Sequence, residues 1–275
     1  MNPHEEFVED KDTYYIYENK PITDEMIEEM KKYKKVYFGD SFNQSICDCL
    51  PNTITHINIG YSFNQSLDNL PSTIQCIYFG ANNIFNMPLD NLPEGLVDLD
   101  LNMCRSFNQP IDKLPSSLEI LNLGSEFQQS VDNLPPNLKK LFFGWYFDTP
   151  IDNLPASLEE LYLGEKFNQT VDFLPTGLKK LVFGSYFDKS VDNLPLGLED
   201  LTFGFYFNQP IDNLPVSRNF GGKKGLQNIT FDSNFNQSIN NLPSGLKYIT
   251  LKKNGEFNIP IDIDKLPNGL VIEYM

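Results

Sequence analysis

The chain has 275 residues and a formal net charge of −16 at pH 7, because 37 Asp and Glu outnumber 21 Lys and Arg. This acidic balance argues against nucleic acids and anionic membranes as partners, since both would repel the chain. Because 40% of the residues are hydrophobic, the chain can bury a substantial core, and the composition excludes wholesale disorder.

Residues 1–35 predict a small acidic cap at the N-terminus. Thr13–Tyr17 has the composition of a strand, and Thr23 is a candidate N-cap for a helix from about Asp24 to Tyr33. Acidic residues open this helix and lysines close it, as the helix dipole favours. We expect this strand and helix to cover the first open end of the repeats that follow, with an acidic docking tail as the alternative.

Compartment signals are weak but consistent with one another. The N-terminus lacks the basic start and apolar stretch of a signal peptide, and no run of about 18 apolar residues is present to span a membrane. The four cysteines include Cys47-x-Cys49, but no second close pair completes a set of four metal ligands. We therefore expect free thiols, no metal site and an intracellular, cytoplasmic protein.

A repeat of 20 to 22 residues follows the cap. Leu-Pro recurs eleven times, and a Phe stands seven residues before nearly every copy. In Leu138–Gly144 (Leu-x-x-Leu-x-Phe-Gly) the apolar residues alternate with the period of a strand, the glycine ends the strand, and Leu154-Pro155 turns the chain. A unit this short has no room for a full helix and cannot fold alone. The pattern predicts a mainly β, right-handed, leucine-rich-repeat-like solenoid over residues 36–275, with about 11 units and one short parallel strand per unit.

The repeat is interrupted at two places, and three polar or glycine positions recur in most units. An insertion lies near residues 217–224, and Glu273 stands where an inward strand residue is expected, so residues 271–275 predict a C-terminal cap. The glycines after the strands predict left-handed or tightly turned backbone. An Asp column two residues before Leu-Pro predicts capping of backbone N–H groups, with Ca²⁺ binding as the alternative. An Asn/Asp column after the Phe predicts hydrogen bonds to backbone within each turn.

Several units carry a recognisable motif. Phe107–Ile111 and Phe207–Ile211 both read Phe-Asn-Gln-Pro-Ile, and Phe257–Pro260 reads Phe-Asn-Ile-Pro. These motifs resemble the FNIP repeat family. This family is related to leucine-rich repeats and is found in amoeboid protists and in large DNA viruses that infect protists. The resemblance covers about Val36 to Leu270. Some family members carry an N-terminal F-box for ubiquitin-ligase substrates, but the first 35 residues are too short for one. The resemblance therefore implies the fold more strongly than a ubiquitin-ligase role.

The residues that flank the inward strand positions are expected to line the concave face of the solenoid. They vary from unit to unit while the framework does not, as a surface that recognises a partner requires. One aromatic and charged group falls on neighbouring units beside the strand ends, where we predict a protein-binding site; sugar stacking and packing over the rim are the alternatives. The predicted partner-binding residues are Phe142, Trp145, Tyr146, Tyr162, Tyr186, Phe205, Tyr206, Lys140, Glu160 and Lys180.

Catalysis has little support in the sequence. The only histidines are His4 and His56, and no phosphate loop, nucleophile elbow or metal-ligand spacing is present. We therefore expect no catalytic residues, no cofactor and no metal. The function predicted is a protein–protein interaction scaffold or adaptor. The alternatives are a receptor for a glycan or small ligand, and a structural protein of a virus particle or a homo-oligomer.

Overall fold

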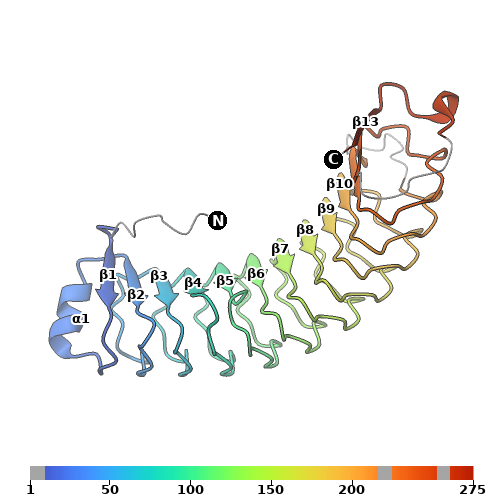
Figure 1. Ribbon diagram of the computed structural model, residues 1–275. Helices are drawn as coiled ribbons and strands as arrows, with labels where there is room; N and C mark the ends of the chain where they lie inside the picture. The colour runs from blue at the N-terminus through green and yellow to red at the C-terminus, as the bar shows by residue number, and fades with distance from the viewer. Residues whose placement is uncertain (1–9, 216–224, 253–260, 275) are drawn as a thin grey trace.

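The computed structural model describes residues 10–215, 225–252 and 261–274. Within these residues, thirteen strands form one sheet in chain order, and every neighbouring pair is parallel. Each turn of the chain supplies one strand and returns to the sheet through loops (Figure 1). The predicted parallel solenoid is confirmed. The insertion near residues 217–224 and the motif at Phe257–Pro260 lie outside the described residues.

The strands are short and the helical content is small. The strands are β1 (Thr13–Ile16), β2 (Lys35–Phe38), β3 (His56–Ile59), β4 (Cys76–Phe79), β5 (Asp98–Asp100), β6 (Ile120–Asn122), β7 (Lys140–Phe142), β8 (Glu160–Tyr162), β9 (Lys180–Val182), β10 (Asp200–Thr202), β11 (Asn228–Phe231), β12 (Tyr248–Leu251) and β13 (Val271–Tyr274). The helices are α1 (Asp24–Met30) and the 3-10 turn η1 (Ile263–Lys265). No helix in the described ranges is long and apolar enough to cross a membrane.

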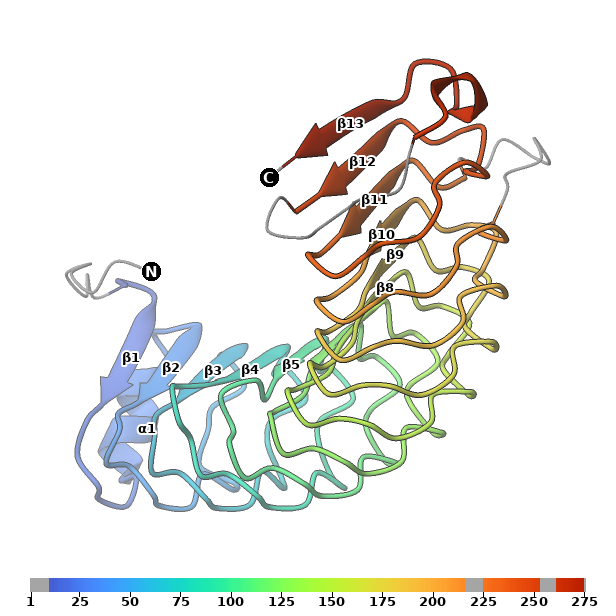
Figure 2. The same cartoon turned by 45° about the vertical axis from the view of Figure 1, so that its right-hand side comes forward.

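The sheet lines the inner side of a curved arc, and the return loops form its outer side (Figures 1 and 2). In β7, Leu141 is buried while Lys140 and Phe142 are half-exposed, so alternate residues point into the core and onto the concave face. The same register continues from strand to strand, as Lys140 lies opposite Glu160 and Phe142 opposite Tyr162. The concave columns expected from the repeat are therefore confirmed.

A column of phenylalanine rings runs through the core. The rings of Phe147 and Phe167 have centroids 6.2 Å apart and planes only 4° from parallel, and Phe187 continues the stack at 6.3 Å. All three side chains are fully buried. Since each ring contacts the unit before it and the unit after it, neighbouring units stabilise one another and none of them has a core of its own.

Most of the glycines that follow the strands are required by close approach, whereas a Cβ on Gly80 would have its nearest atom at 3.3 Å. A Cβ on Gly164 would lie 1.9 Å from the carbonyl oxygen of Gly144, one unit earlier. Among the described glycines only Gly269 has a positive φ. Of the two alternatives predicted after the strands, left-handed backbone is absent from the described glycines there, and the constraint is the tight stacking of consecutive backbones.

The two polar columns join neighbouring units. The side-chain oxygen of Asn86 accepts from the backbone N–H of Asn108 at 3.0 Å and from the Gln109 amide at 3.2 Å. The Asp132 carboxylate accepts from the Asn153 amide of the next unit at 3.0 Å. The Asn column was predicted to bond backbone within its own turn; the backbone partner is confirmed, but it belongs to the next unit. The Asp column was predicted to cap backbone N–H groups; that was wrong for Asp132, whose partner is the side-chain amide of the next unit. The sequence shows no adjacency between residues of neighbouring units.

The N-terminal strand and helix extend the solenoid. β1 pairs with β2, and the side chains of Ile16 and Met30 are buried in the shared core. Thr23 caps α1, as predicted, by accepting from the N–H of Met26 at 3.4 Å. The helix ends at Met30, three residues before the predicted Tyr33. The fold of this cap is confirmed.

The C-terminal residues form an ordinary strand of the sheet. In β13, Ile272 lies opposite Ile249 and Glu273 opposite Thr250. Glu273 therefore takes a concave-face position, and the inward position predicted for it was wrong. The reason is that the last unit has one residue fewer between its Leu-Pro turn and its strand than the unit before it.

Candidate functional site

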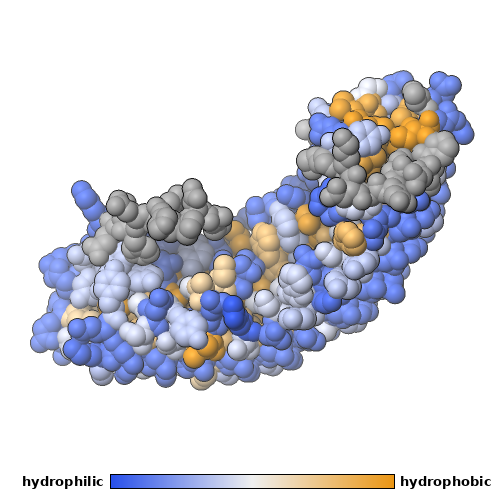
Figure 3. Space-filling model, in the orientation of Figure 1, coloured by the Kyte–Doolittle hydropathy of each residue, from blue (hydrophilic) through white to orange (hydrophobic). Residues whose placement is uncertain are grey.

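The predicted binding residues divide between two surfaces. Five of them lie on the concave face of β7, β8 and β9, and five lie in the turns that follow β7, β9 and β10. No ring contact among the described residues joins the two groups. The outer edge of the arc is mostly hydrophilic, and hydrophobic residues show along its inner side (Figure 3). The concave group is Lys140, Phe142, Glu160, Tyr162 and Lys180, and the turn group is Trp145, Tyr146, Tyr186, Phe205 and Tyr206.

The concave group is a compact cluster of aromatic rings and charges. The rings of Phe142 and Tyr162 stack with centroids 4.3 Å apart. The Lys140 ammonium lies 2.7 Å from the Glu160 carboxylate, which also accepts from the Tyr162 hydroxyl at 3.0 Å. Lys180 places its Nζ 5.2 Å from the centroid of the Tyr162 ring, within cation–π range.

These contacts set the charge state of the cluster. Burial favours the neutral acid at Glu160, but hydrogen bonds from Lys140 and Tyr162 outweigh that effect and lower the carboxyl pKa. The hydrogen bond to Glu160 raises the pKa of Lys140. The cluster therefore carries both a carboxylate and lysine ammonium groups at neutral pH, beside an apolar ring stack.

The turn group is more exposed. Trp145 has 51% of its surface accessible, and with Tyr146 and Arg105 it lines a shallow hollow of about 280 Å³. Further along the same edge, Tyr186 and Tyr206 have centroids 5.0 Å apart, and the Lys166 ammonium lies 3.5 Å from the Tyr186 ring centroid. This edge is a second aromatic surface, separate from the concave cluster.

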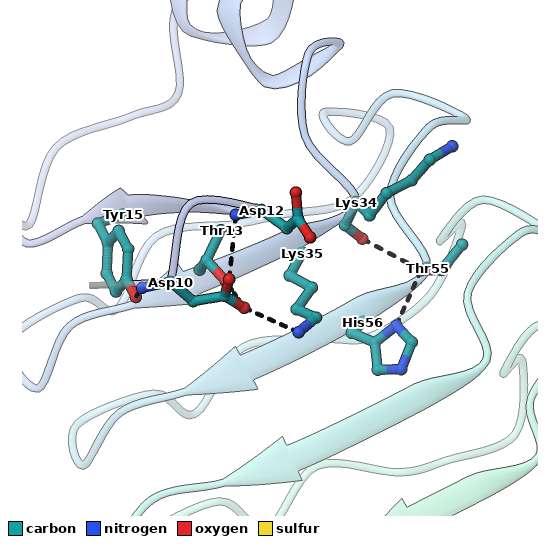
Figure 4. Close-up of polar contacts among 8 residues, drawn as sticks. All are labelled: Asp10, Asp12, Thr13, Tyr15, Lys34, Lys35, Thr55 and His56. Carbon is teal, nitrogen blue, oxygen red and sulfur yellow. Dashed lines mark hydrogen bonds and ion pairs between the residues drawn. The ribbon is translucent and has the colours of Figure 1, made fainter. Parts of the chain in front are cut away.

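A hollow that the sequence did not single out lies on the concave face at the N-terminal end. It has a volume of about 370 Å³, and its walls include Tyr15, Tyr37 and Tyr78. The Asp10–Lys35 ion pair, 2.8 Å long, forms another part of its wall (Figure 4). The sequence missed this hollow because Tyr15 belongs to the cap, and nothing in the repeat predicts that the cap strand joins the sheet.

The Asp10 carboxylate is held in place by several donors. It accepts from the Asp12 N–H at 3.1 Å and from the Thr13 hydroxyl at 3.3 Å, and the hydrogen bond from Lys35 lowers its pKa (Figure 4). The Asp10 N–H in turn donates to the Tyr15 hydroxyl at 2.8 Å. This corner of the concave face is therefore ordered by its own polar contacts.

β5 carries two carboxyl groups on the concave face, and Tyr78 in the wall of this hollow connects it to one of them. The Tyr78 hydroxyl, from β4, donates to the Asp98 carboxylate at 2.9 Å, and the Asp100 carboxylate accepts from the N–H of Asn102 at 2.8 Å. Both side chains are half-buried, and burial raises the pKa of each. No lysine or arginine forms an ion pair with either of them in the part of the chain that the structure describes. A Tyr followed one unit later by an Asp in the concave columns was the signal available in the sequence.

The arrangement offers little for catalysis. His56 and Cys76 are register partners on β3 and β4, and Asp98 follows on β5. Burial raises the pKa of the Cys76 thiol and lowers that of the His56 imidazole, whose Nδ1 lies 2.8 Å from the Thr55 hydroxyl (Figure 4). The thiol is therefore protonated at neutral pH and a poor nucleophile. Over the described ranges, no group of three or more His, Cys, Asp or Glu could hold a metal ion.

Comparison with known proteins gives a family and a fold. The FNIP Repeat model matches residues 32–62, 42–82, 127–166, 167–206 and 207–254. Among solved structures, CroV588, described as a novel circular LRR protein, aligns with a TM-score of 0.62 and 29% identity over 95% of this chain and 49% of its own. The chain thus spans about half the length of that protein. YopM from Yersinia enterocolitica aligns with a TM-score of 0.45 and 18% identity over 88% of this chain and 63% of its own. No curated protein matches the chain.

Proposed function

The chain belongs to the FNIP repeat family, and from this premise we propose that it is a non-catalytic scaffold that binds another protein through the concave face of its sheet. The leucine-rich-repeat-like fold is one that commonly serves protein interactions. The observation that carries the proposal is the stacked Phe142–Tyr162 pair, which stays half-exposed on the concave face while the core beneath it is closed.

The chemistry of the concave cluster suits a protein partner. Aromatic side chains supply rigid contact area, and such residues contribute much of the binding energy in protein interfaces. The surrounding lysines and Glu160 carry charges of both signs, which favours a polar polypeptide surface over a polyanion. The free state of the four cysteines, Cys47, Cys49, Cys76 and Cys104, is consistent with action in a reducing, intracellular compartment.

A receptor for a glycan is the second candidate function. It is favoured by the exposed Trp145, which lines the hollow at the turn edge with Tyr146 and Arg105. An exposed indole beside a hydrogen-bonding side chain is suited to stacking on a sugar ring. This candidate uses the turn edge, so it can be separated experimentally from the first.

Affinity capture with matched variants tests the proposal. The full chain is used to capture proteins from cells of the native host, with the double variant Phe142→Ala and Tyr162→Ala and the control pair Trp145→Ala and Tyr206→Ala. We expect the concave pair to lose a partner that the control pair retains. Equal recovery of every captured protein by the concave pair and the wild type would refute the concave site. A glycan array that binds the wild type, and not the Trp145→Ala variant, would favour the second candidate.

A further inference from the structure

On the concave face, a carboxylate and a tyrosine hydroxyl form a hydrogen-bonded acid–phenol pair. The ammonium groups that contact this pair are lysines of the chain itself. On β8, the Tyr162 hydroxyl donates to the Glu160 carboxylate. The two neighbouring strands each direct a lysine to this pair: Lys140 reaches the carboxylate at 2.7 Å, and Lys180 lies over the phenol ring at 5.2 Å. An acid and a phenol in this arrangement therefore bind ammonium groups on this face.

A second arrangement of the same kind lies three to four units earlier, on β4 and β5, in a different setting. The Tyr78 hydroxyl donates to the Asp98 carboxylate at 2.9 Å across β4 and β5. The register partners of Asp98 are Cys76 and Ile120, so neither neighbouring strand supplies a lysine here. Asp100, at the other concave position of β5, adds a second carboxylate.

The half-buried positions of Asp98 and Asp100 destabilise their ionised forms when no cation is bound. Burial raises the pKa of Asp98 and of Asp100, which means that the surroundings destabilise the ionised forms. A half-buried carboxylate without a cation costs stability, and this cost is removed when an opposite charge reaches it. Ionisable groups whose pKa is shifted by their surroundings are typical of binding sites.

The neighbouring hollow provides room for a long side chain. Tyr78 belongs both to the acid–phenol pair and to the wall of the 370 Å³ hollow, which Tyr37 and Asn58 also line. A lysine or arginine can lay its apolar stem along the tyrosine rings and direct its charged head toward the carboxylates.

We propose that Asp98, Asp100 and Tyr78 bind a lysine or arginine side chain of a protein partner, presented by a basic segment that crosses the concave face over β3 to β6. The proposal rests on the proposed function and specifies the chemistry of the partner. The net charge of −16 favours the same occupant, because it attracts a basic segment from a distance.

The test uses the full chain and a fluorescein-labelled peptide of alternating glycine and lysine, with its glutamine analogue as the neutral peptide. Binding is measured by fluorescence anisotropy at low and at physiological salt. The site variant is Asp98→Asn with Asp100→Asn, which keeps the side-chain shapes. The control is Glu94→Gln with Asp152→Asn, which removes the same two charges from exposed positions on the turns. Far-UV circular dichroism and a melting curve check that each variant is folded.

We expect the site variant to bind the lysine peptide about tenfold more weakly than the wild type, and the control to stay within about twofold. Equal weakening in the two variants would overturn the site, because the net charge alone would then explain binding. Absence of lysine-peptide binding to the wild type, or equal binding of the glutamine peptide, would also overturn it. Competition by spermine as strong as that of the peptide would assign the site to a small cation and refute a protein segment.

The outcome is separable from that of the proposed function. If capture of the native partner is lost in the Phe142→Ala and Tyr162→Ala variant but unchanged in the Asp98→Asn and Asp100→Asn variant, the scaffold stands and this inference fails. If capture is unchanged in both variants, the concave scaffold fails as well.

Discussion

Replacing Phe167 with alanine tests the physical basis of the solenoid. The Phe167 ring has no exposed surface and stacks on Phe147 at 6.2 Å and on Phe187 at 6.3 Å. Burial of a phenylalanine side chain contributes about 1.5–3 kcal/mol, and each aromatic contact adds about 0.5–1.5 kcal/mol. With two contacts these contributions add to about 2.5–6 kcal/mol. We expect Phe167→Ala to lower the free energy of unfolding by about 3–5 kcal/mol, the range found for buried Phe to Ala changes, which lies within that sum.

Urea unfolding followed by circular dichroism measures this loss, and hydrogen exchange locates it. We expect amide protection to fall first in the units of Phe147, Phe167 and Phe187, because coupling is between nearest neighbours. The control is Phe173→Ala, since Phe173 is 70% exposed and its loss should change stability by no more than about 0.5 kcal/mol. Comparable effects of the two substitutions, or a uniform loss of protection along the chain, would refute the stacked core as the source of stability.

Two further predictions follow from close packing and from charge. Gly164→Ala should lower the melting temperature, because its Cβ would lie 1.9 Å from a carbonyl oxygen, while Gly245→Ala, with the nearest atom at 4.0 Å, should leave it nearly unchanged. Asp98→Asn should raise the melting temperature at neutral pH and have little effect in acid. The folded pKa of Asp98 lies above its unfolded value, so the wild type loses stability as the pH rises from the unfolded pKa through the folded pKa. The Asp98→Asn variant has no such loss because its amide does not ionise. A melting curve at each pH measures both effects, and an equal gain in acid would contradict the second. The titratable groups near Asp98 are Asp100, Tyr78, Cys76 and His56.

The repeat could be predicted from the sequence because the features that define each unit are local. Leu-Pro turns, glycines after alternating apolar residues and a phenylalanine at constant spacing each act within a few residues, so their recurrence predicts the unit and its strand. The register of concave residues followed from the same spacing, and it placed Lys140 opposite Glu160 and Phe142 opposite Tyr162. The concave part of the candidate site was therefore predictable, although nothing in the sequence separated it from Trp145 and the other turn residues.

The remaining features depend on what lies one unit away in space. The sequence alone determined the solenoid, its strands and the columns of its inner face, because these follow from periodicity. Only the tertiary structure decided that Asn86 bonds the next unit, that Gly164 is needed for close stacking, and that Tyr78, in the wall of a hollow that the cap helps to form, reaches Asp98. Those contacts join residues about twenty positions apart, and their geometry is set by how closely successive turns of the chain pack, which no local pattern of residues records.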